Sequence, residues 1–264
     1  MEKVKIVLVE PAGALNIGSI ARVMKNMALT QLVLVKPKCD HQGEEARLMA
    51  VHAQDVLDNA VIAPDLPTAL GNCQRAIATT ARSRAIPTDL ETPKQALPWL
   101  IEDNLDTALI FGPEDRGLSN QELSYGQRFI CIPSNPEYPS LNLAQAVSVC
   151  AYELYQEHLA KQNSVSSPPK IDNSAAYVNL LSNSSQGVSS EGVSSDSAPA
   201  EAVEAYYKDL ESLLLEIGYL YPHTAAARML KWRRLYNRAN LKPEEVSMLR
   251  GMLRQIKWGM AQKP

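Results

Sequence analysis

The sequence has few of the features that mark metal-binding, disulfide-rich or membrane proteins. Its four cysteines and four histidines are scattered over 264 residues, without a Cys-x-x-Cys pair or a histidine four residues from another ligand. This excludes the usual zinc patterns, and the apolar runs around Cys131 and Cys150 indicate reduced, buried thiols. No apolar run approaches the ~18 residues of a membrane span, and no signal-peptide pattern precedes the first strand-like run. We therefore expect a cytoplasmic protein without metal or membrane anchor.

Familiar nucleotide-binding loops are missing as well. There is no Gly-x-Gly-x-x-Gly and no Gly-Lys-Ser/Thr, which argues against a Rossmann-type NAD enzyme and against a P-loop protein. Apolar residues make up 45% and charged residues 21% of the chain, and the net charge is −3. These values are those of an ordinary globular protein, so any nucleic-acid surface must be local.

Residues 1–160 alternate short apolar runs with helical patterns. The runs are continuously apolar rather than alternating, which is typical of strands buried on both faces of a parallel sheet; they span residues 4–10, 31–37, 75–81, 108–112 and 129–133. One helical pattern between them predicts a buried face made of Ile17, Ile20, Ala21, Met24, Met27 and Ala28. The pattern predicts an α/β domain with helices on both sides of the sheet.

The last hundred residues have a different composition. Residues 161–200 contain twelve serines and predict a flexible linker. Three amphipathic stretches follow at residues 202–220, 224–239 and 242–260, with prolines near their boundaries, and predict a small helical domain. From His223 to Lys257 this domain carries nine Lys/Arg against two Glu, with Trp232, Tyr236 and Trp258 interleaved. A solvated helix face would explain any one of these residues, but the excess as a whole indicates nucleic-acid binding.

Three unusual segments follow predicted strands, where parallel α/β sheets bind ligands. In the first, Asn16 suits a helix N-cap, and Gly18 and Arg22 share one face of the helix. A surface arginine on a capped helix would explain this segment equally well. In the second, residues 108–123, Gly112 lets a ligand approach the backbone and Gly117 permits a turn with positive φ. A capping box, Ser119-x-x-Glu122, then begins a helix.

The third segment has the sequence "PSNPEYPSLNLAQAV". Its prolines stiffen the chain after the strand, and Ser140 can cap a helix that begins near Leu141. Asn142 then lies in the first turn of an otherwise apolar helix, where a carboxamide needs a polar partner. A proline-rich connection explains Ser140 but not Asn142.

Together the segments resemble motifs 1, 2 and 3 of the SpoU/TrmH-type RNA 2′-O-ribose methyltransferases, which belong to the SPOUT superfamily. Here the motifs read Asn16-x-Gly18-x-x-x-Arg22, "LIFGPEDRGLSNQEL" and "CIPSNPEYPSLNLAQAVSVCAYE". The resemblance covers Val4 to Glu157, and "TTARSR" at residues 79–84 and the later helices are similar to the TrmJ branch, which methylates nucleotide 32 of the tRNA anticodon loop.

The resemblance implies a SPOUT-type parallel sheet with a deep trefoil knot, and a homodimer with active sites at the interface. It also implies a catalytic domain over residues 1–160, the serine-rich linker over 161–200, and a basic helical tRNA-binding domain over 201–264. S-adenosylmethionine would bind in the knot at Thr79, Thr80, Ala81, Gly112, Ile132, Pro139, Ser140 and Leu141.

The resemblance likewise implies the residues that act on RNA. The catalytic set would be Arg22, Asn16, Ser140, Asn142 and Glu114. tRNA contacts would come from Arg22, Arg82, Arg84, Arg228, Lys231, Arg233, Arg234 and Arg238. The cofactor carries the activated methyl group, so we expect no metal. Arg22 either stabilises the developing alkoxide or takes the ribose proton, and the first role is favoured because a guanidinium group is a poor base.

Two residues depart from the pattern, and two alternatives stay open. Pro113 stands where TrmJ proteins often have arginine, and Pro139 where a small polar residue is common; neither can donate a backbone N–H. One alternative is an enzyme for another tRNA position or for rRNA, because accessory surfaces select the substrate. The other is a non-catalytic RNA-binding SPOUT protein, against which the intact Asn16, Arg22, Ser140 and Asn142 argue.

Overall fold

The first 165 residues form a domain built on a single parallel sheet. The computed structural model describes residues 1–81, 90–165 and 197–261; of residues 163–165 it describes only the backbone. The sheet has seven strands in the order β3-β2-β1-β6-β4-β7-β5, and every neighbouring pair is parallel. The strands are β1 (Val4–Val9), β2 (Gln31–Val35), β3 (Val61–Ala63), β4 (Arg75–Thr79), β5 (Leu90–Glu91), β6 (Thr107–Phe111) and β7 (Arg128–Ile130). This arrangement places the carboxyl ends of β1, β4, β6 and β7 at one edge.

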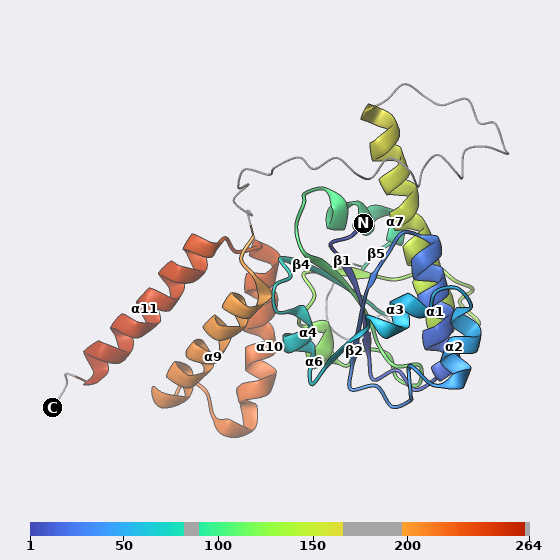
Figure 1. Cartoon of the computed structure of the whole chain (residues 1–264). Helices are drawn as coiled ribbons and strands as arrows, with labels where there is room; N and C mark the ends of the chain where they lie inside the picture. Colours follow the sequence, from blue (N-terminus) through green and yellow to red (C-terminus); the bar gives the residue numbers. More distant parts are fainter. Residues whose placement is uncertain (82–89, 166–196, 262–264) are drawn as a thin grey trace.

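Helices cover both faces of the sheet (Figure 1). One face carries α1 (Ala14–Asn26), α2 (Glu44–Ala50), α3 (Gln54–Asp58), α5 (Pro93–Ala96), the 3-10 helix η1 (Leu97–Ile101) and α7 (Leu143–Val165). The other carries α4 (Leu66–Leu70) and α6 (Asn120–Leu123). Because side chains alternate along a strand, Ile6 and Leu8 join the first core while Val7 and Val9 join the second. The predicted α/β architecture is confirmed.

The structure corrects several boundaries. All five predicted strands are present, but the short edge strands β3 and β5 were missed, because neither is a continuous buried run. Helix α1 ends at Asn26, so Met27 and Ala28 fall outside it; Ala28 is exposed in a turn with φ of 53°, and Leu29 is buried instead. The predicted buried face is therefore right for its first four members, Met27 packs partly buried against the core just beyond the helix, and only Ala28 is wrong.

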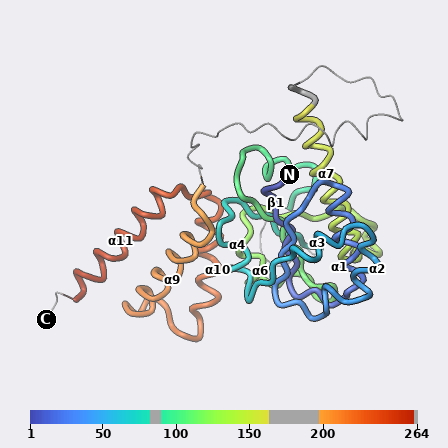
Figure 2. Tube along the Cα trace, viewed as in Figure 1, coloured from blue at the N-terminus to red at the C-terminus, as the bar shows by residue number. Residues whose placement is uncertain are grey.

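The three C-terminal helices are confirmed as α9 (Ala200–Glu216), α10 (Pro222–Ala239) and α11 (Pro243–Ala261), and a proline begins each of the last two. Their core is separate from those of the sheet and includes Tyr206, Tyr207, Leu210, Met229 and Leu253. Helix α11 packs against α9 and extends away from the sheet domain (Figures 1 and 2).

Ordered residues occur at both ends of the predicted linker. Helix α7 continues to Val165, and Ser197 and Ala198 are buried. The amide of Ala200 donates to the carbonyl of Cys73 at 2.9 Å, which joins the start of α9 to the sheet domain. Residues 166–196 of the linker lie outside the described residues, and the trefoil knot stays a prediction. Within the described ranges, no helix is long and apolar enough to cross a membrane.

Candidate functional site

A cavity lies beyond the carboxyl ends of β4, β6 and β7. Its walls come from the end of β4, from residues 112–118 after β6, and from residues 139–141 before α7, with Phe111, Ile130 and Leu143 adding apolar surface. The structure brings to this cavity all eight positions expected to hold the cofactor: Thr79, Thr80, Ala81, Gly112, Ile132, Pro139, Ser140 and Leu141. Segments from residue 79 to residue 141 thus form one concave surface, while the role of each residue stays a prediction.

A chain of hydrogen bonds links the three motifs beside this cavity. The Asn142 side-chain amide donates to Asn16 Oδ1 at 3.0 Å, and Asn16 Nδ2 donates to Glu114 Oε1 at 2.9 Å. The other Glu114 oxygen accepts from the Ala12 amide at 3.3 Å. Three members of the expected catalytic set are therefore in contact, although Asn16 and Asn142 are separated by 126 residues.

These hydrogen bonds explain why two helix starts were predicted wrongly. Helix α1 begins at Ala14 after Gly13, so Asn16 lies inside its first turn and uses its side chain to bond Glu114 rather than to cap the helix. Helix α7 begins at Leu143, and its cap is Asn142, not Ser140. Asn142 Oδ1 accepts from the amides of Ala144 at 2.9 Å and Gln145 at 3.4 Å. Ser140 is exposed and lines the cavity.

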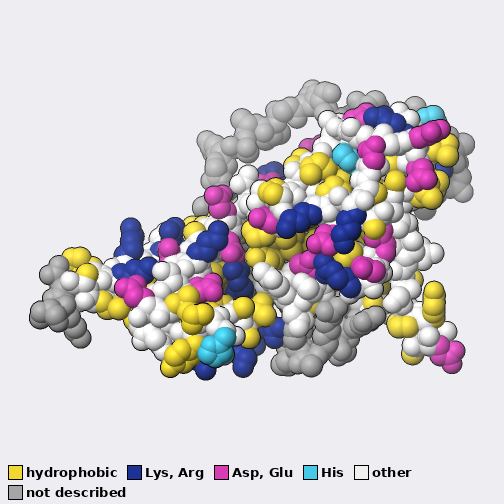
Figure 3. All heavy atoms as spheres, turned by 90° about the horizontal axis from the view of Figure 1, so that it is seen from below, with side chains coloured by type: hydrophobic (Ala, Val, Ile, Leu, Met, Phe, Trp, Pro, Cys, Tyr) yellow, Lys and Arg dark blue, Asp and Glu magenta, His cyan; other side chains and the backbone are white. Residues whose placement is uncertain are grey.

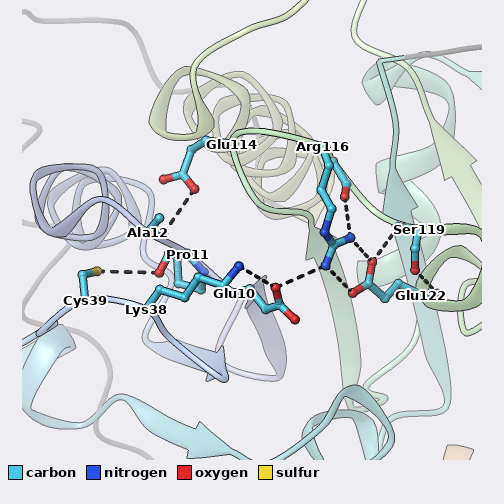
Figure 4. A network of polar contacts seen from close by, with 10 residues as sticks. Glu10, Pro11, Ala12, Lys38, Cys39, Glu114, Arg116, Ser119 and Glu122 are labelled. Carbon is cyan, nitrogen blue, oxygen red and sulfur yellow. Dashed lines mark hydrogen bonds and ion pairs between the residues drawn. The ribbon is translucent and has the colours of Figure 1, made fainter.

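The turn after β6 is held by an ion-pair network (Figure 4). Arg116 donates to both oxygens of Glu122, at 2.8 and 3.0 Å, and lies 3.4 Å from a Glu10 oxygen, which also pairs with Lys38 at 2.8 Å. The predicted capping box is confirmed: the Ser119 amide donates to Glu122, and the Glu122 amide donates to Ser119 Oγ. The sequence reasoning missed the roles of Glu10 and Lys38, because their partners are distant in sequence, and it missed the pairing of Arg116 with Glu122 although only six residues separate them.

The network also shifts the acidity of its carboxyl groups. Burial pushes the pKa of Glu122 upward, but hydrogen bonds from Arg116 and Ser119 outweigh it and hold that pKa below its usual value. The hydrogen bond from Lys38, with a smaller contribution from Arg116, lowers the pKa of Glu10. Both carboxylates thus stay ionised and keep the turn beside the cavity in one conformation.

The two motif glycines are required by close packing. A Cβ on Gly112 would lie 2.2 Å from the Leu118 amide nitrogen and 2.4 Å from the Gly117 carbonyl carbon. The turn therefore occupies the place of a side chain at this position, although Gly112 also lines the cavity. Gly117 of the same turn has the predicted positive φ of 65°. A Cβ on Gly18 would lie 2.2 Å from the Ala46 carbonyl oxygen, so Gly18 permits α1 and α2 to pack closely.

Arg22 does not reach this cavity within one chain. It lies on the exposed side of α1, two turns beyond Asn16, which at about 1.5 Å per residue is roughly 9 Å along the helix. Arg22 does not line the cavity, and no hydrogen bond or ion pair holds it to any other described residue. The structure thus unites Asn16, Asn142, Glu114 and Ser140 but leaves Arg22 apart.

The basic residues of α10 divide into two groups. Arg233 is largely buried: it pairs with both oxygens of Glu204, at 2.5 and 2.7 Å, and stacks on the rings of Tyr207 and Tyr125. It is therefore not available to RNA, which corrects its predicted role. Arg228 donates to the Tyr219 carbonyl, whereas Lys231, Arg234 and Arg238 have no such partner among the described residues. Arg82 and Arg84 lie outside the described residues.

The interleaved aromatic residues also differ from one another. Trp232 and Tyr236 stack on each other and are only partly exposed, packed against the helical core. Trp258 is 58% exposed. Only Trp258 of the three therefore keeps a largely free aromatic surface.

The cysteines and other possible ligands form no centre in the described part of the chain. All four thiols are free, and burial raises the pKa of Cys150 to about 12. Across residues 1–81, 90–165 and 197–261, no three His, Cys, Asp or Glu side chains gather as a metal site.

Comparisons with known proteins agree with this geometry. Residues 3–152 match the SpoU rRNA Methylase family, and residues 201–264 match the C-terminal domain of the tRNA methyltransferase TrmJ. The tRNA (cytidine/uridine/adenosine-2′-O-)-methyltransferase TrmJ of Pseudomonas aeruginosa is 37% identical over 256 residues, which cover 96% of this chain and 93% of that protein. The tRNA (cytidine/uridine-2′-O-)-methyltransferase TrmJ of Cronobacter sakazakii is 36% identical, with both chains covered completely.

Structural comparison extends the similarity to both domains. The crystal structure of TrmJ from Z. mobilis matches with a TM-score of 0.78 and 30% identity, covering 96% of this chain and 98% of that one. A probable methylase family protein from Haemophilus influenzae matches with a TM-score of 0.60 and 29% identity, covering 98% of each chain. The chain therefore belongs to the SpoU rRNA methylase family and, within it, to the TrmJ RNA 2′-O-methyltransferases.

Proposed function

We propose that this protein transfers a methyl group from S-adenosylmethionine to a ribose 2′-oxygen of tRNA, at nucleotide 32 of the anticodon loop. The observation that carries the proposal is a cavity lined by the second and third motifs, with Asn16 of the first motif hydrogen-bonded to Glu114 of that lining and to Asn142 beside it. The activity after which the full-length relatives are named supports tRNA as the substrate. tRNA as substrate in turn supports a cytoplasmic location.

The cavity fits the proposed cofactor in its chemistry. Apolar side chains of Ile130, Ile132 and Leu143 can contact an adenine ring, and the backbones of residues 79–81, 112–118 and 139–141 can supply polar contacts, except for the N–H groups that Pro113 and Pro139 lack. Bound there, S-adenosylmethionine supplies an activated methyl group. The protein's own task is then to hold the ribose oxygen in line and to stabilise its developing charge.

We assign that electrostatic task to Arg22. A guanidinium keeps its proton at neutral pH, so it acts as a donor to the oxygen or the adjacent phosphate rather than as a base. The chain Asn142–Asn16–Glu114 orients the groups around it, and Ser140 positions the ribose. Because Arg22 lies apart from the cavity of its own chain, we propose a homodimer in which α1 of one copy faces the cavity of the other. Exposed apolar side chains on α1 and α7, such as Leu15, Val149 and Tyr152, support such an interface.

We further propose a division of labour between residues 1–160, which carry out the reaction, and the basic helices of residues 201–264, which bind tRNA. The Ser-rich segment between them connects the two. The family matches over residues 3–152 and 201–264 support these boundaries.

The test is methylation of unmodified tRNA, with ribose methylation mapped by mass spectrometry. We expect one methyl group at nucleotide 32 with the wild-type protein. Arg22→Ala should lower the rate by about 100-fold or more, the usual effect of removing a donor to a developing oxyanion, and should leave S-adenosylmethionine binding nearly unchanged in calorimetry. Lys25→Ala, which removes another exposed cation of α1, is the control and should keep its activity.

Retained turnover in Arg22→Ala would refute the role of Arg22. Methylation at another nucleotide would refute position 32 while leaving the chemistry intact. Binding of tRNA with no methyl transfer under any condition would contradict the enzyme itself.

A further inference from the structure

A groove runs between the edge of the sheet and the C-terminal domain. One wall is β7 with the turn before it, including Gly126 and Phe129, and the other is the face of α10 that carries Lys231, Arg234 and Arg238. Strand β7 also borders the cavity described above, since Ile130 lines the cavity and its neighbour Phe129 lines the groove. The groove and the cavity therefore share one strand.

The charge of this groove is strongly biased. Its acidic residue, Glu91, is bound by Arg128, whose Nε donates to Glu91 Oε1 at 2.8 Å, so these two charges neutralise each other. Lys231, Arg234 and Arg238 remain, and no described residue pairs with any of them. Their i, i+3 and i+7 spacing places them along one side of α10 over roughly 10 Å, at about 1.5 Å of rise per residue.

Arg234 shows that the groove is more than a solvated helix face. It is only partly exposed, and burial lowers the pKa of its guanidinium below the ordinary value. The neighbouring Arg233 is compensated by Glu204, whereas Arg234 has no carboxylate in the described part of the chain. A partly desolvated cation without a counter-charge is unfavourable, and an anionic ligand would offset that cost.

The walls of the groove are held in a fixed relation. Asn237 Nδ2 donates to the Ser124 carbonyl at 2.8 Å, and the Arg233 guanidinium lies 5.2 Å from the centre of the Tyr125 ring. Both contacts connect α10 directly to the segment that leads into β7. The cations are therefore presented at a set distance from the sheet edge, which suits a ligand that contacts both walls.

We propose that this groove binds the sugar–phosphate backbone of the RNA substrate, with Lys231, Arg234 and Arg238 on successive phosphates of one strand. Phe129 offers an aromatic edge beside the path of the strand. A row of cations beside an aromatic residue suits RNA better than an acidic protein segment, because only RNA repeats its charge regularly and carries flat bases. The proposal rests on the proposed function and adds the path by which RNA approaches the cavity along β7.

The experiment compares two triple variants of the full chain in tRNA binding over a range of salt concentrations. The groove variant is Lys231→Gln/Arg234→Gln/Arg238→Gln. The control is Lys208→Gln/Arg254→Gln/Lys257→Gln, which removes the same charge from α9 and α11. We expect the groove variant to raise the Kd for tRNA about 10-fold or more and to reduce the slope of log Kd against log salt by about 2, as expected when three phosphate contacts are lost. The control, whose cations lie outside the groove, should lose clearly less affinity for tRNA than the groove variant.

Equal weakening in both variants would overturn the proposal, because the effect would then follow net charge alone. Unchanged binding in the groove variant would also overturn it and would leave an acidic protein segment as the class of ligand. Because Arg234 is partly buried, Lys231→Glu/Arg238→Glu, which changes only exposed residues, must show the same loss of affinity. If wild type binds tRNA through the groove but transfers no methyl group, the proposed function fails while the groove stands.

Discussion

The cavity and the groove differ in whether their charged side chains are paired with one another. Around the cavity, charged side chains satisfy one another: Arg116 bonds Glu122, and Glu10 bonds Lys38. Along the groove, Lys231, Arg234 and Arg238 are left without partners among the described residues. Figure 3 shows that Lys and Arg recur along the part of the surface formed by α9–α11, with Asp and Glu among them, and that both signs of charge are also intermixed over the sheet domain.

This difference indicates what each region does. Paired charges hold a backbone conformation, and the cavity is built mainly from backbone segments that must keep their shape. Unpaired cations attract an external anion and add little to the stability of the fold. Substitutions near the cavity should therefore alter folding and cofactor binding, whereas substitutions in the groove should alter salt-dependent RNA binding.

The largest effect should come from Gly112→Ala. The added Cβ would lie 2.2 Å from the Leu118 amide nitrogen, so the turn must open, at a cost of about 3 kcal/mol or more in the free energy of unfolding. Loss of measurable S-adenosylmethionine binding should accompany it in calorimetry. The matched control is Gly251→Ala, where the Cβ meets nothing within 4 Å and a helical alanine should stabilise by about 0.5–1 kcal/mol. Normal cofactor binding by Gly112→Ala would show that the turn is not rigid.

Substitutions that affect the two neighbouring arginines of α10, Arg233 and Arg234, should give opposite results. Glu204→Gln leaves the buried Arg233 without its carboxylate and should lower the stability of the C-terminal domain by about 3 kcal/mol, measured by thermal unfolding and by hydrogen exchange of α9 and α10. Arg234→Gln should change stability little and weaken tRNA binding instead. If Glu204→Gln weakened RNA binding without any loss of stability, the distinction between Arg233 as a structural cation and Arg234 as an RNA-binding cation would be wrong.

The smallest effect concerns acid stability. Hydrogen bonds hold the pKa of Glu122 below its unfolded value of about 4.3, so its contribution to stability is present above that pH and is lost as the pH falls through the lower, folded-state value. Glu122→Gln should lower stability by about 1–2 kcal/mol at pH 7 and show a shallower decline below pH ~4. Melting temperatures of both proteins from pH 3 to 8 measure this. If the melting temperatures of the two proteins changed with pH in parallel, another carboxylate would be responsible for the loss of stability in acid.

Local sequence patterns predicted those strands and helix starts that depend only on neighbouring residues. Continuous apolar runs located the five central strands, and Ser119-x-x-Glu122 located the start of α6, because burial on both faces and capping depend on neighbouring residues. Prediction failed at the caps of α1 and α7. Asn16 and Ser140 are both good capping residues, but Asn16 is engaged by Glu114, and Asn142 caps α7.

The sequence by itself determined the type of fold through its hydrophobic pattern and the family through its motifs. The set of residues that meet at the cavity followed from the resemblance of those motifs to the family. Only the tertiary structure decided which of the polar residues are structural. Asn142 contacts Asn16, and Arg116 contacts Glu10, across more than a hundred residues of chain. Likewise, adjacent arginines at 233 and 234 differ because only one faces Glu204. A side chain is available to a ligand only if the fold brings it no partner of its own, and that depends on contacts between segments that no local pattern encodes.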